Sequence, residues 1–241
     1  MDLKHLDELG AVEGTYWWHV AKRELVIELL RRRFPPPTRL VEGGVGAGGN
    51  LLAFQQLGYQ VIGFDLLPEA VAQCRRLGFD DVHVHDLQEP WPLEAGSAGV
   101  AVMLDVLEHT PDPVTVLRNA AATLGPGGGI VLTVPAGPWL MGPWDRMLGH
   151  YRRYTAALLR KQARSAGLRV AWLSHWNAFS LPPALAVRSL EKVFDRPRGA
   201  EVPPVSPWLN ALLIRCARLE RRWMRGCPLP VGLSLVGVLV P

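Results

Sequence analysis

The sequence has few cysteines and lacks any hydrophobic run long enough to cross a bilayer as a helix. Cys74, Cys216 and Cys227 form no CxxC pair, and their odd number argues against a disulfide framework, so we expect all three to be small buried residues. The longest clean apolar run, 231–240, is shorter than the roughly 20 residues that a membrane-spanning helix needs. The charged segment 1–8 does not resemble a signal sequence. The sequence therefore predicts a cytoplasmic protein.

Charge is sparse and nearly balanced along most of the chain. The formal net charge is +4, and segment 207–226 alone accounts for that excess, because it holds five arginines and one glutamate. Since the remainder is neutral and no basic stripe is interleaved with stacking aromatics, we expect no nucleic-acid partner. His83 and His85 share one face of a predicted strand, but no third ligand of suitable spacing lies nearby. We therefore expect no metal site.

Length and hydrophobic patterning indicate one α/β domain with an elaboration. At 241 residues and 49% hydrophobic content, the chain can bury a full core. Short apolar segments alternate with helical patterns, which predicts a doubly wound parallel sheet covered on both faces. We expect strands near 39–43, 60–64, 82–85, 99–104 and 129–134, and helices near 49–57, 68–76 and 113–123. The glycine-rich segment 124–129 is interpreted as a tight turn before the last of these strands.

The remaining patterns divide the chain into a leading cap, the sheet domain and an insert. The expected limits are 1–37 for the N-terminal cap helix, 38–177 and 229–241 for the sheet domain, and 178–228 for the helical insert. Within them we expect a cap helix over 23–34, strands at 168–176 and 232–240, and insert helices at 181–194 and 207–226. The cap helix should lie over the crevice at the carboxyl ends of the strands, and the insert is much longer than ordinary connections.

The segment 40–50, Leu-Val-Glu-Gly-Gly-Val-Gly-Ala-Gly-Gly-Asn, is the most informative feature of the chain. Glu42 ends an apolar run, and Gly44 and Gly46 follow it, where the absence of a Cβ lets the backbone approach a ligand closely. A helix then opens near Leu51, with its N-terminal amides facing the same crevice. The spacing also satisfies the G-x-G-x-x-G pattern of NAD- and FAD-binding folds, and a flexible turn between strand and helix is a further alternative.

Three further acids follow successive predicted strands. Asp65 comes 23 residues after Glu42, where a carboxylate can accept the ribose hydroxyls of a nucleoside. Asp86 could meet the amino group of an adenine, and Asp105 closes the series. One such acid could be a helix cap, but four at successive strand ends indicate a nucleoside site.

The order of these motifs, from Val41 to Gly48 and on through Asp65, Asp86 and Asp105, resembles the class I S-adenosylmethionine-dependent methyltransferases. Blocks 16–23 and 149–155 are similar to a bacterial branch of small methyltransferases, of the methyltransferase-11/23-like type. The resemblance implies a Rossmann-like fold of seven mostly parallel strands with an antiparallel last strand. It also implies S-adenosylmethionine as the cofactor, held by Glu42, Gly44, Gly46, Asp65, Leu66, Asp86, Leu87 and Leu104, with Trp17 and Arg23 contributing from the cap. The departures are valine at position 45, where members often carry cysteine, and glutamate at 42 in place of aspartate.

The region after residue 134 is expected to contact the methyl acceptor. Segment 135–144 is rich in proline, glycine and tryptophan, which suits a loop packed over a ligand. The block 149–154 precedes a helix that Thr155 caps, and positive charge at a helix start requires an anionic neighbour in the protein or in the substrate. The candidate substrate contacts are Trp139, Arg153 and Tyr154.

Two histidines are candidate catalytic bases. Methyl transfer from a sulfonium is an in-line displacement that mainly requires alignment and exclusion of water. A hydroxyl acceptor usually also needs a base, and imidazole titrates near neutral pH. His109 follows the fourth strand, and His150 precedes the Thr155 helix. Either could instead be a structural, hydrogen-bonding residue.

Helix 207–226 is predicted to be amphipathic and basic. The apolar positions that share a face at helical spacing are Trp208, Leu209, Leu212, Leu213, Cys216, Leu219 and Trp223, and the arginines are expected on the other face. Such a helix can lie on an anionic membrane surface. Alternatively, the apolar face packs on the sheet domain and the arginines are solvated.

Three functions fit the sequence. The first is methyl transfer to a small or lipid-linked acceptor, at oxygen, with peripheral membrane contact through 207–226. The second is NAD-dependent oxidation or reduction, which the glycine pattern permits and the acid series disfavours. The third is a non-catalytic module that binds a membrane or a partner through helix 207–226.

Overall fold

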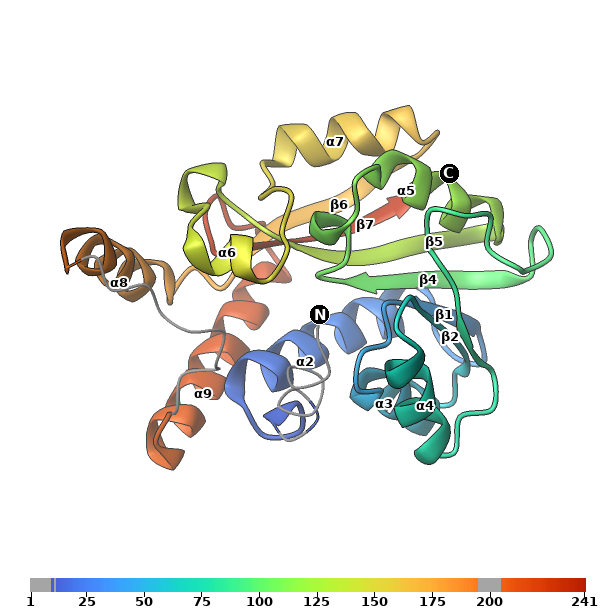
Figure 1. Ribbon diagram of the computed structural model, residues 1–241, viewed down its shortest axis with the longest axis horizontal. Coiled ribbons are helices and arrows are strands. Elements are labelled where there is room, and N and C mark those ends of the chain that lie inside the picture. Colours follow the sequence, from blue (N-terminus) through green and yellow to red (C-terminus); the bar gives the residue numbers. More distant parts are fainter. Residues whose placement is uncertain (1–9, 11, 195–204) are drawn as a thin grey trace.

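The protein is built on a seven-stranded sheet (Figure 1). The computed structural model describes residue 10, residues 12–194 and residues 205–241. The strands are β1 (Arg39–Gly43), β2 (Gln60–Asp65), β3 (Val82–Val84), β4 (Ala98–Leu104), β5 (Leu124–Pro135), β6 (Arg169–Trp176) and β7 (Ser234–Val240), in the order β3-β2-β1-β4-β5-β7-β6. β7 runs antiparallel to β5 and β6, and the other pairs are parallel. The predicted sheet, with its antiparallel last strand, is confirmed.

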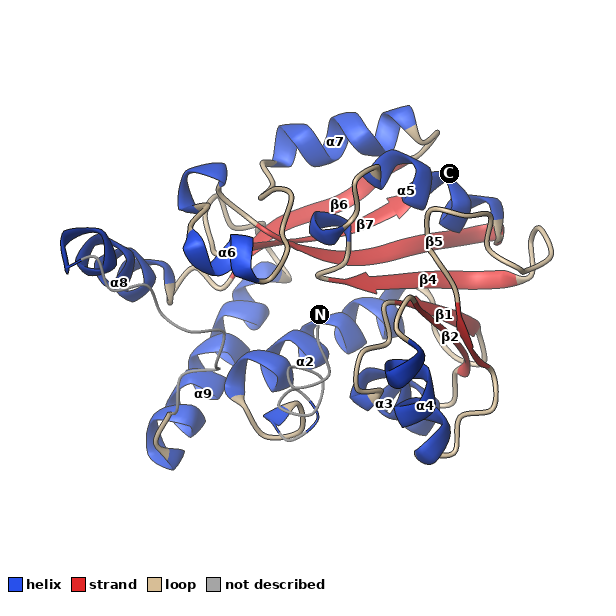
Figure 2. Ribbon diagram, viewed as in Figure 1, coloured by secondary structure: helices blue, strands red, loops and turns tan. Residues whose placement is uncertain are grey.

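Helices cover both faces of the sheet (Figure 2). They are α2 (Trp17–Arg33), α3 (Gly49–Gln56), α4 (Pro68–Arg76), α5 (Pro113–Ala122), α6 (Pro143–Met147), α7 (Ala156–Ser165), α8 (Leu181–Phe194) and α9 (Pro207–Met224), with short 3-10 turns η1 (Leu107–His109) and η2 (Pro138–Leu140). In Figure 1, α5 and α7 lie on one face of the central strands and α2 and α9 on the other. The two predicted insert helices are therefore present as α8 and α9.

Two hydrophobic clusters hold these layers together. On one face, Leu117 of α5 and Leu159 of α7 are fully buried against the sheet. On the other, Leu25, Val26 and Leu30 of α2 occupy one helical face and pack in a second cluster. Each fully buried side chain of this size stabilises the fold by roughly 1.5–3 kcal/mol. Helix α2 begins at Trp17, which is earlier than the start of the predicted helix 23–34.

The glycine-rich segment 124–129 is part of strand β5 and not the predicted tight turn. Ala98 of β4 pairs with Leu124, and Val100 pairs with Gly129, so the residues between them form a bulge on β5. Gly127 in this bulge has a φ of +77°, which favours glycine. The glycines are structural, as expected, but they belong to the strand.

The three cysteines are free thiols in different environments. Cys74 is buried, as predicted, whereas Cys216 is half-buried and Cys227 is exposed. The expectation that all three are buried is therefore wrong for two of them. Within the described ranges, no helix combines the length and the apolar character needed to span a bilayer.

Helix α9 is docked mainly by its arginine side, and only part of the predicted apolar face, Leu209, Leu213 and Cys216, is half-buried. Ala217 and Met224 are its buried residues, and its arginines form ion pairs with two acids of α2. These pairs join Arg218 and Arg221 to Glu24, and Arg221 and Arg225 to Glu28. Burial acts to raise the pKa of Glu24 and Glu28, but hydrogen bonds from these arginines outweigh it and hold both pKa values below the usual range. Arg218, Arg221 and Arg225 are thus docking residues, whereas Arg215 and Arg222 are exposed, as are several large apolar side chains of α9.

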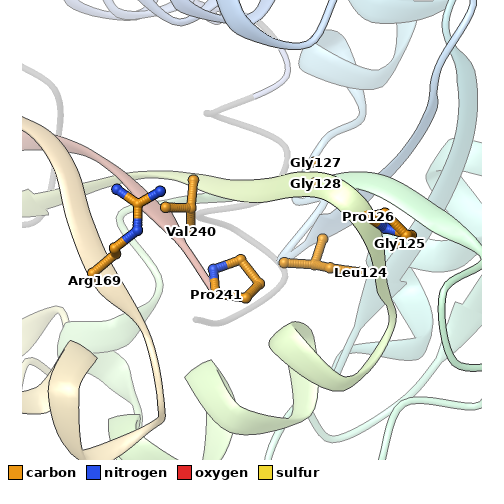
Figure 3. A pocket seen from close by; sticks show the side chains of 8 residues that line it. All are labelled: Leu124, Gly125, Pro126, Gly127, Gly128, Arg169, Val240 and Pro241. Atoms are coloured by element: carbon orange, nitrogen blue, oxygen red, sulfur yellow. The ribbon is translucent and has the colours of Figure 1, made fainter.

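The hollow in Figure 3 lies away from the strand ends that carry the acids. It has a volume of about 500 Å³ and is lined by the β5 bulge, Arg169 and the end of β7 at Val240 and Pro241. Parallel strands point their carboxyl ends to the same edge, and β5 begins here, so this hollow is at the amino edge. Ligands of doubly wound sheets bind at the other edge.

Candidate functional site

Acidic side chains gather at the carboxyl edge of the sheet, as the sequence predicts. Glu42 in β1 pairs in register with Gly63 of β2 and Val102 of β4, so these three strands end side by side. Asp65 is the last residue of β2, and Asp105 directly follows β4. The crevice at this edge is therefore formed by residues far apart in the sequence.

Glu42 has one carboxylate oxygen available for a ligand. The side chain is fully buried, and Oε1 accepts a hydrogen bond from Asn50 Nδ2 at 3.3 Å. Oε2 is buried and has no hydrogen-bond partner among the described residues. Burial, and then the nearby Glu13, raises the pKa of Glu42 well above its usual value. A buried acceptor in this state is stabilised when a ligand supplies a donor.

The glycine loop brings its backbone close to the acids. Gly44 and Gly48 have φ values of +80° and +89°, and Gly48 caps the start of α3. A Cβ on Gly48 would lie 2.9 Å from Cys74 Sγ, and one on Gly44 would lie 2.7 Å from Val106. Larger residues are therefore excluded by both conformation and space.

Asp65 and Asp86 occupy different environments beside this loop. Asp65 accepts hydrogen bonds from Gly46 N and Leu67 N, both at 3.0 Å, and burial raises its pKa. Asp86 is half-buried and accepts from Gln88 N. Both carboxylates lie at the predicted edge. Each accepts hydrogen bonds from backbone amides, so part of its acceptor capacity is already used within the protein.

Asp105 pairs with a cation from the cap helix. Its Oδ2 lies 2.8 Å from Lys22 Nζ, and its Oδ1 accepts from Thr133 Oγ1 at 2.9 Å. Burial acts to raise the pKa of Asp105, but Lys22 and the Thr133 hydrogen bond outweigh it and lower the pKa. The φ of Asp105 is +57°, which is unusual for a residue with a side chain. This contact brings the cap helix to the end of β4, and Lys22 was missed from the sequence.

A second cap contact reaches Glu42 through Arg23. Arg23 Nε donates to Asn50 Oδ1 at 3.0 Å, and Asn50 in turn donates to Glu42. The Arg23 guanidinium also lies 3.4 Å from the buried carboxylate of Glu13, which accepts from Gly49 N. Glu13 and Asn50 were not predicted; the short polar residue just after the glycines was the available signal for Asn50.

His109 and His150 lie side by side at the end of β4. Their ring centroids are 4.6 Å apart in an edge-to-face arrangement. His150 Nδ1 is 3.2 Å from Asp145 Oδ1, and Arg153 Nε donates to the same oxygen at 2.7 Å. Asp145 is therefore the anionic neighbour expected for the basic block 149–154, and it lies in the protein.

The histidine pair is electrostatically asymmetric. Burial would raise the pKa of Asp145, but the His150 hydrogen bond and the Arg153 guanidinium hold it well below its usual value, so the group is a carboxylate. Burial, and then His150, lowers the pKa of His109 to about 4. His109 is therefore neutral at pH 7, and Asp145 orients His150 through Nδ1.

Glu108 completes a cluster with the two histidines. Ligand atoms of Glu108, His109 and His150 all lie within 4.8 Å of one another. Glu108 is fully buried, and neither of its carboxylate oxygens has a hydrogen-bond partner among the described residues. A carboxylate and two imidazoles can hold a divalent cation or share a proton. The sequence expectation of no metal site considered only the His83 region and missed this cluster; His83 pairs with Asp81.

The other predicted contacts have mixed positions. Leu87 and Leu104 are 8% exposed beneath the edge, whereas Leu66 and Trp139 are each 63% exposed. Trp17 packs against Trp18 and Phe179, at ring distances of 5.6 and 5.9 Å. Tyr154 is fully buried in the hydrophobic core, and its backbone pairs with Pro135. That position favours a structural role for Tyr154 over contact with a substrate.

Comparisons with known proteins identify the family to which the chain belongs. Residues 17–173 match the family described as Methyltransferase domain. Ubiquinone biosynthesis O-methyltransferases from Xanthomonas axonopodis pv. citri and Xanthomonas campestris pv. campestris are 31% and 34% identical over 144 and 143 residues, covering 53% of this chain and 59% of each relative. A putative methyltransferase solved with the Haloferax volcanii activator Trm112 has a TM-score of 0.62 at 21% identity, covering 98% of this chain and 96% of that one. The chain belongs to the class I S-adenosylmethionine-dependent methyltransferase family.

Proposed function

We propose that the protein transfers a methyl group from S-adenosylmethionine to an oxygen atom of a small or lipid-linked acceptor. The observation that carries this proposal is the Asp145–His150–His109 group at the same sheet edge as Glu42 and the glycine loop. A nucleoside site and an oriented imidazole thus share one crevice. Methyl transfer to a hydroxyl is favoured by this combination, because the crevice aligns the reactants and the imidazole accepts the proton.

The chain's own residues fit the cofactor. The buried, unpartnered Oε2 of Glu42 can accept a ribose hydroxyl, and Asp65 lies at the end of the neighbouring strand. Gly44 and Gly46 keep side chains out of the cradle. Arg23 and Glu13 present both signs of charge at the start of α3, which suits the carboxylate and ammonium groups of an amino acid. When bound, S-adenosylmethionine supplies an electrophilic methyl group.

The oriented histidine performs the proton transfer in this proposal. Asp145 holds Nδ1 of His150, so Nε2 is the nitrogen that accepts the acceptor's hydroxyl proton. Asp145 also stabilises the imidazolium that results, because its own pKa lies well below its usual value. His109 is neutral at pH 7 and packs edge-on against His150, which restricts the ring.

Oxygen as the accepting atom is supported by the relatives and by the site. The similar proteins are named O-methyltransferases of ubiquinone biosynthesis, although this chain spans only about three-fifths of their length. Exposed Trp139, Met147 and Tyr151 lie on the segment between β5 and α7, close in sequence to His150. Large apolar side chains at this position favour a bulky, hydrophobic acceptor.

A methyl-transfer assay tests this function. Radiolabelled S-adenosylmethionine would be incubated with the protein and a panel of hydroxylated aromatic compounds, with and without alkyl tails, beside matched amines. We expect labelled ethers from hydroxylated acceptors, and His150→Gln should abolish them while cofactor affinity is kept. Methylation of amines only, or full activity in His150→Gln, would contradict the proposal. A fluorescence titration with NADH addresses the oxidoreductase alternative, for which we expect no binding.

A divalent cation is a second candidate occupant beside the histidines. The observation that favours it is the unpartnered, fully buried Glu108 carboxylate within reach of both imidazoles. Addition of Mn²⁺ or Mg²⁺ to chelator-treated protein should then raise the melting temperature, and Glu108→Gln should remove the rise. His83→Gln, at a surface histidine paired with Asp81, is the matched control. An equal response in wild type and Glu108→Gln would exclude this cluster as the cation site.

A further inference from the structure

Helix α9 presents a stripe of large apolar side chains to solvent. Trp208, Leu212, Leu219 and Trp223 are 70%, 45%, 64% and 68% exposed. Their positions, spaced by one or two helical turns, place all four on one side of the helix. We call these four residues the α9 stripe. Exposed apolar residues in such an alignment mark a surface that binds something.

The stripe does not result from a loosely attached helix. The opposite side of α9 is fixed to α2 by four ion pairs between three arginines and two glutamates. Glu220 accepts hydrogen bonds from the backbone amides of Asn177, Ala178 and Phe179, just before α8. Near the start of α9, Asn210 accepts a hydrogen bond from Trp17 N and donates one to Thr15 O. These polar contacts orient α9 so that the stripe faces outward.

Two arginines border the stripe. Arg215 and Arg222 are both exposed and lie on the same side of the helix as Leu219. Within the described ranges neither is in an ion pair, unlike Arg218, Arg221 and Arg225. The stripe therefore combines tryptophan at both ends, leucine between them and uncompensated positive charge.

We propose that the α9 stripe binds the surface of a membrane that contains anionic lipids. A helix with tryptophan and leucine on one face and arginine beside them can lie at a membrane surface, with the apolar side chains at the boundary between headgroups and acyl chains. Tryptophan rings are favoured at this boundary, and arginines are attracted to the negative surface potential. Within α9 the only acidic residue is Glu220, whose carboxylate accepts hydrogen bonds from the backbone amides of residues 177–179 and does not belong to the stripe.

The stripe lies on a helix that contacts the cap helix. Asn210, in the first turn of α9, accepts a hydrogen bond from the first residue of α2, and the next turns of α2 carry Lys22 and Arg23, which contact Asp105 and Asn50. A membrane held by the stripe would thus be near the entrance for a lipid-linked acceptor. Binding to vesicles does not depend on methyl transfer, so the two proposals can fail separately.

Vesicle co-sedimentation tests the proposal with the full chain. Vesicles of phosphatidylcholine alone would be compared with vesicles that also contain phosphatidylglycerol. We expect wild-type protein to bind the mixed vesicles more tightly. Arg215→Gln/Arg222→Gln should weaken that binding by roughly thirtyfold, because each basic residue contributes about one kcal/mol near an anionic surface. Trp208→Ser/Trp223→Ser should weaken binding to both vesicle types.

The control variant is Arg160→Gln/Arg164→Gln, on the exposed side of α7 across the sheet, which removes the same charge and should bind like wild type (Figure 1). Melting temperature and cofactor affinity should be unchanged in every variant, which shows that each is folded. Absence of vesicle binding by folded wild type, or equal loss in the α7 control, would overturn the proposal. A dimer in light scattering that disappears in Trp208→Ser/Trp223→Ser, without vesicle binding, would overturn it as well and assign the stripe to a second copy of the chain.

Discussion

Replacement of Glu42 by glutamine should separate cofactor binding from folding. The glutamine amide keeps the shape of the side chain and an oxygen for Asn50, but it removes the negative charge that the second oxygen of Glu42 offers to a ligand. A hydrogen bond to a charged group contributes about 1.5–3 kcal/mol, which corresponds to a loss of roughly 10- to 150-fold in affinity for S-adenosylmethionine. Isothermal titration with the cofactor and with its demethylated product measures this change.

The same substitution should remove a pH dependence of binding. Burial raises the pKa of Glu42, so in the free protein the carboxyl holds its proton above its usual titration range. A ligand that donates hydrogen bonds favours the carboxylate, so binding releases a proton below the raised pKa. Wild-type affinity should therefore increase with pH, by at most about tenfold per unit, and become constant above that pKa. Glu42→Gln should show no such increase.

The stability of the ligand-free protein provides the internal check. Because the folded pKa of Glu42 is raised, its contribution to stability is greatest below about pH 4.5 and is lost as pH rises through the folded pKa. Glu42→Gln should therefore be at least as stable as wild type at pH 7. Glu94→Gln, at an exposed glutamate in the connection before β4, controls for net charge. An affinity within threefold of wild type, or a lower melting temperature at pH 7, would refute the reasoning.

Three further predictions concern the histidine pair, the α2–α9 contact and the glycine loop. Asp145→Asn should lower kcat by on the order of 100-fold or more with little change in cofactor affinity, because the imidazole loses its orienting carboxylate; an unchanged kcat would contradict this. Glu24→Gln/Glu28→Gln removes the acids of four ion pairs and should lower the melting temperature by about 4–8 °C in dilute buffer, with a smaller difference in high salt. In wild type this contribution should be lost as pH falls below about 4.5 through the lowered pKa values, and equal salt dependence in both proteins would contradict it. Gly48→Ala should destabilise the fold by roughly 1–2 kcal/mol in urea unfolding, since it combines a φ of +89° with a close approach to Cys74; a neutral effect would contradict it.

Hydrophobic periodicity and the acids that follow the predicted strands were sufficient to predict the sheet and the edge at which those acids gather. The alternation of apolar segments determines which residues are buried, and parallel strands must bring their carboxyl ends together, so Glu42, Asp65 and Asp105 could be placed from the sequence. The β5 bulge could not, because a glycine run has the same local preference whether it turns or continues a strand.

The docking face of α9 could not be predicted from its own sequence. The spacing of its residues predicted the helix and two distinct sides, but which side is buried depends on the partner. That partner is an acidic pair, Glu24 and Glu28, one helical turn apart on α2. The available signal was this spacing, because two acids on one face of α2 can meet the arginines of α9.

Asp145 could not be identified as the partner of the histidines for a similar reason. It lies in a segment whose tryptophans, prolines and glycines suggested a loop over a ligand. Its full burial arises only when 142–153 folds back on itself and brings Arg153 and His150 to the same oxygen. Such convergence is a property of the folded loop.

Helix α2 connects the carboxyl edge of the sheet with helix α9. Consecutive residues Lys22 and Arg23 contact Asp105 and Asn50 at the carboxyl edge of the sheet, while Glu24 and Glu28 form ion pairs with α9. Helix α2 is therefore the direct structural connection through which a displacement of α9 by a bound surface would reach Asp105 and Asn50. Thermodynamic reciprocity then requires that a surface which strengthens cofactor binding is itself bound more tightly by the loaded protein. The cofactor affinity of wild type with and without anionic vesicles measures the sign of this coupling, and a value unchanged by vesicles would show that α2 keeps the two events independent.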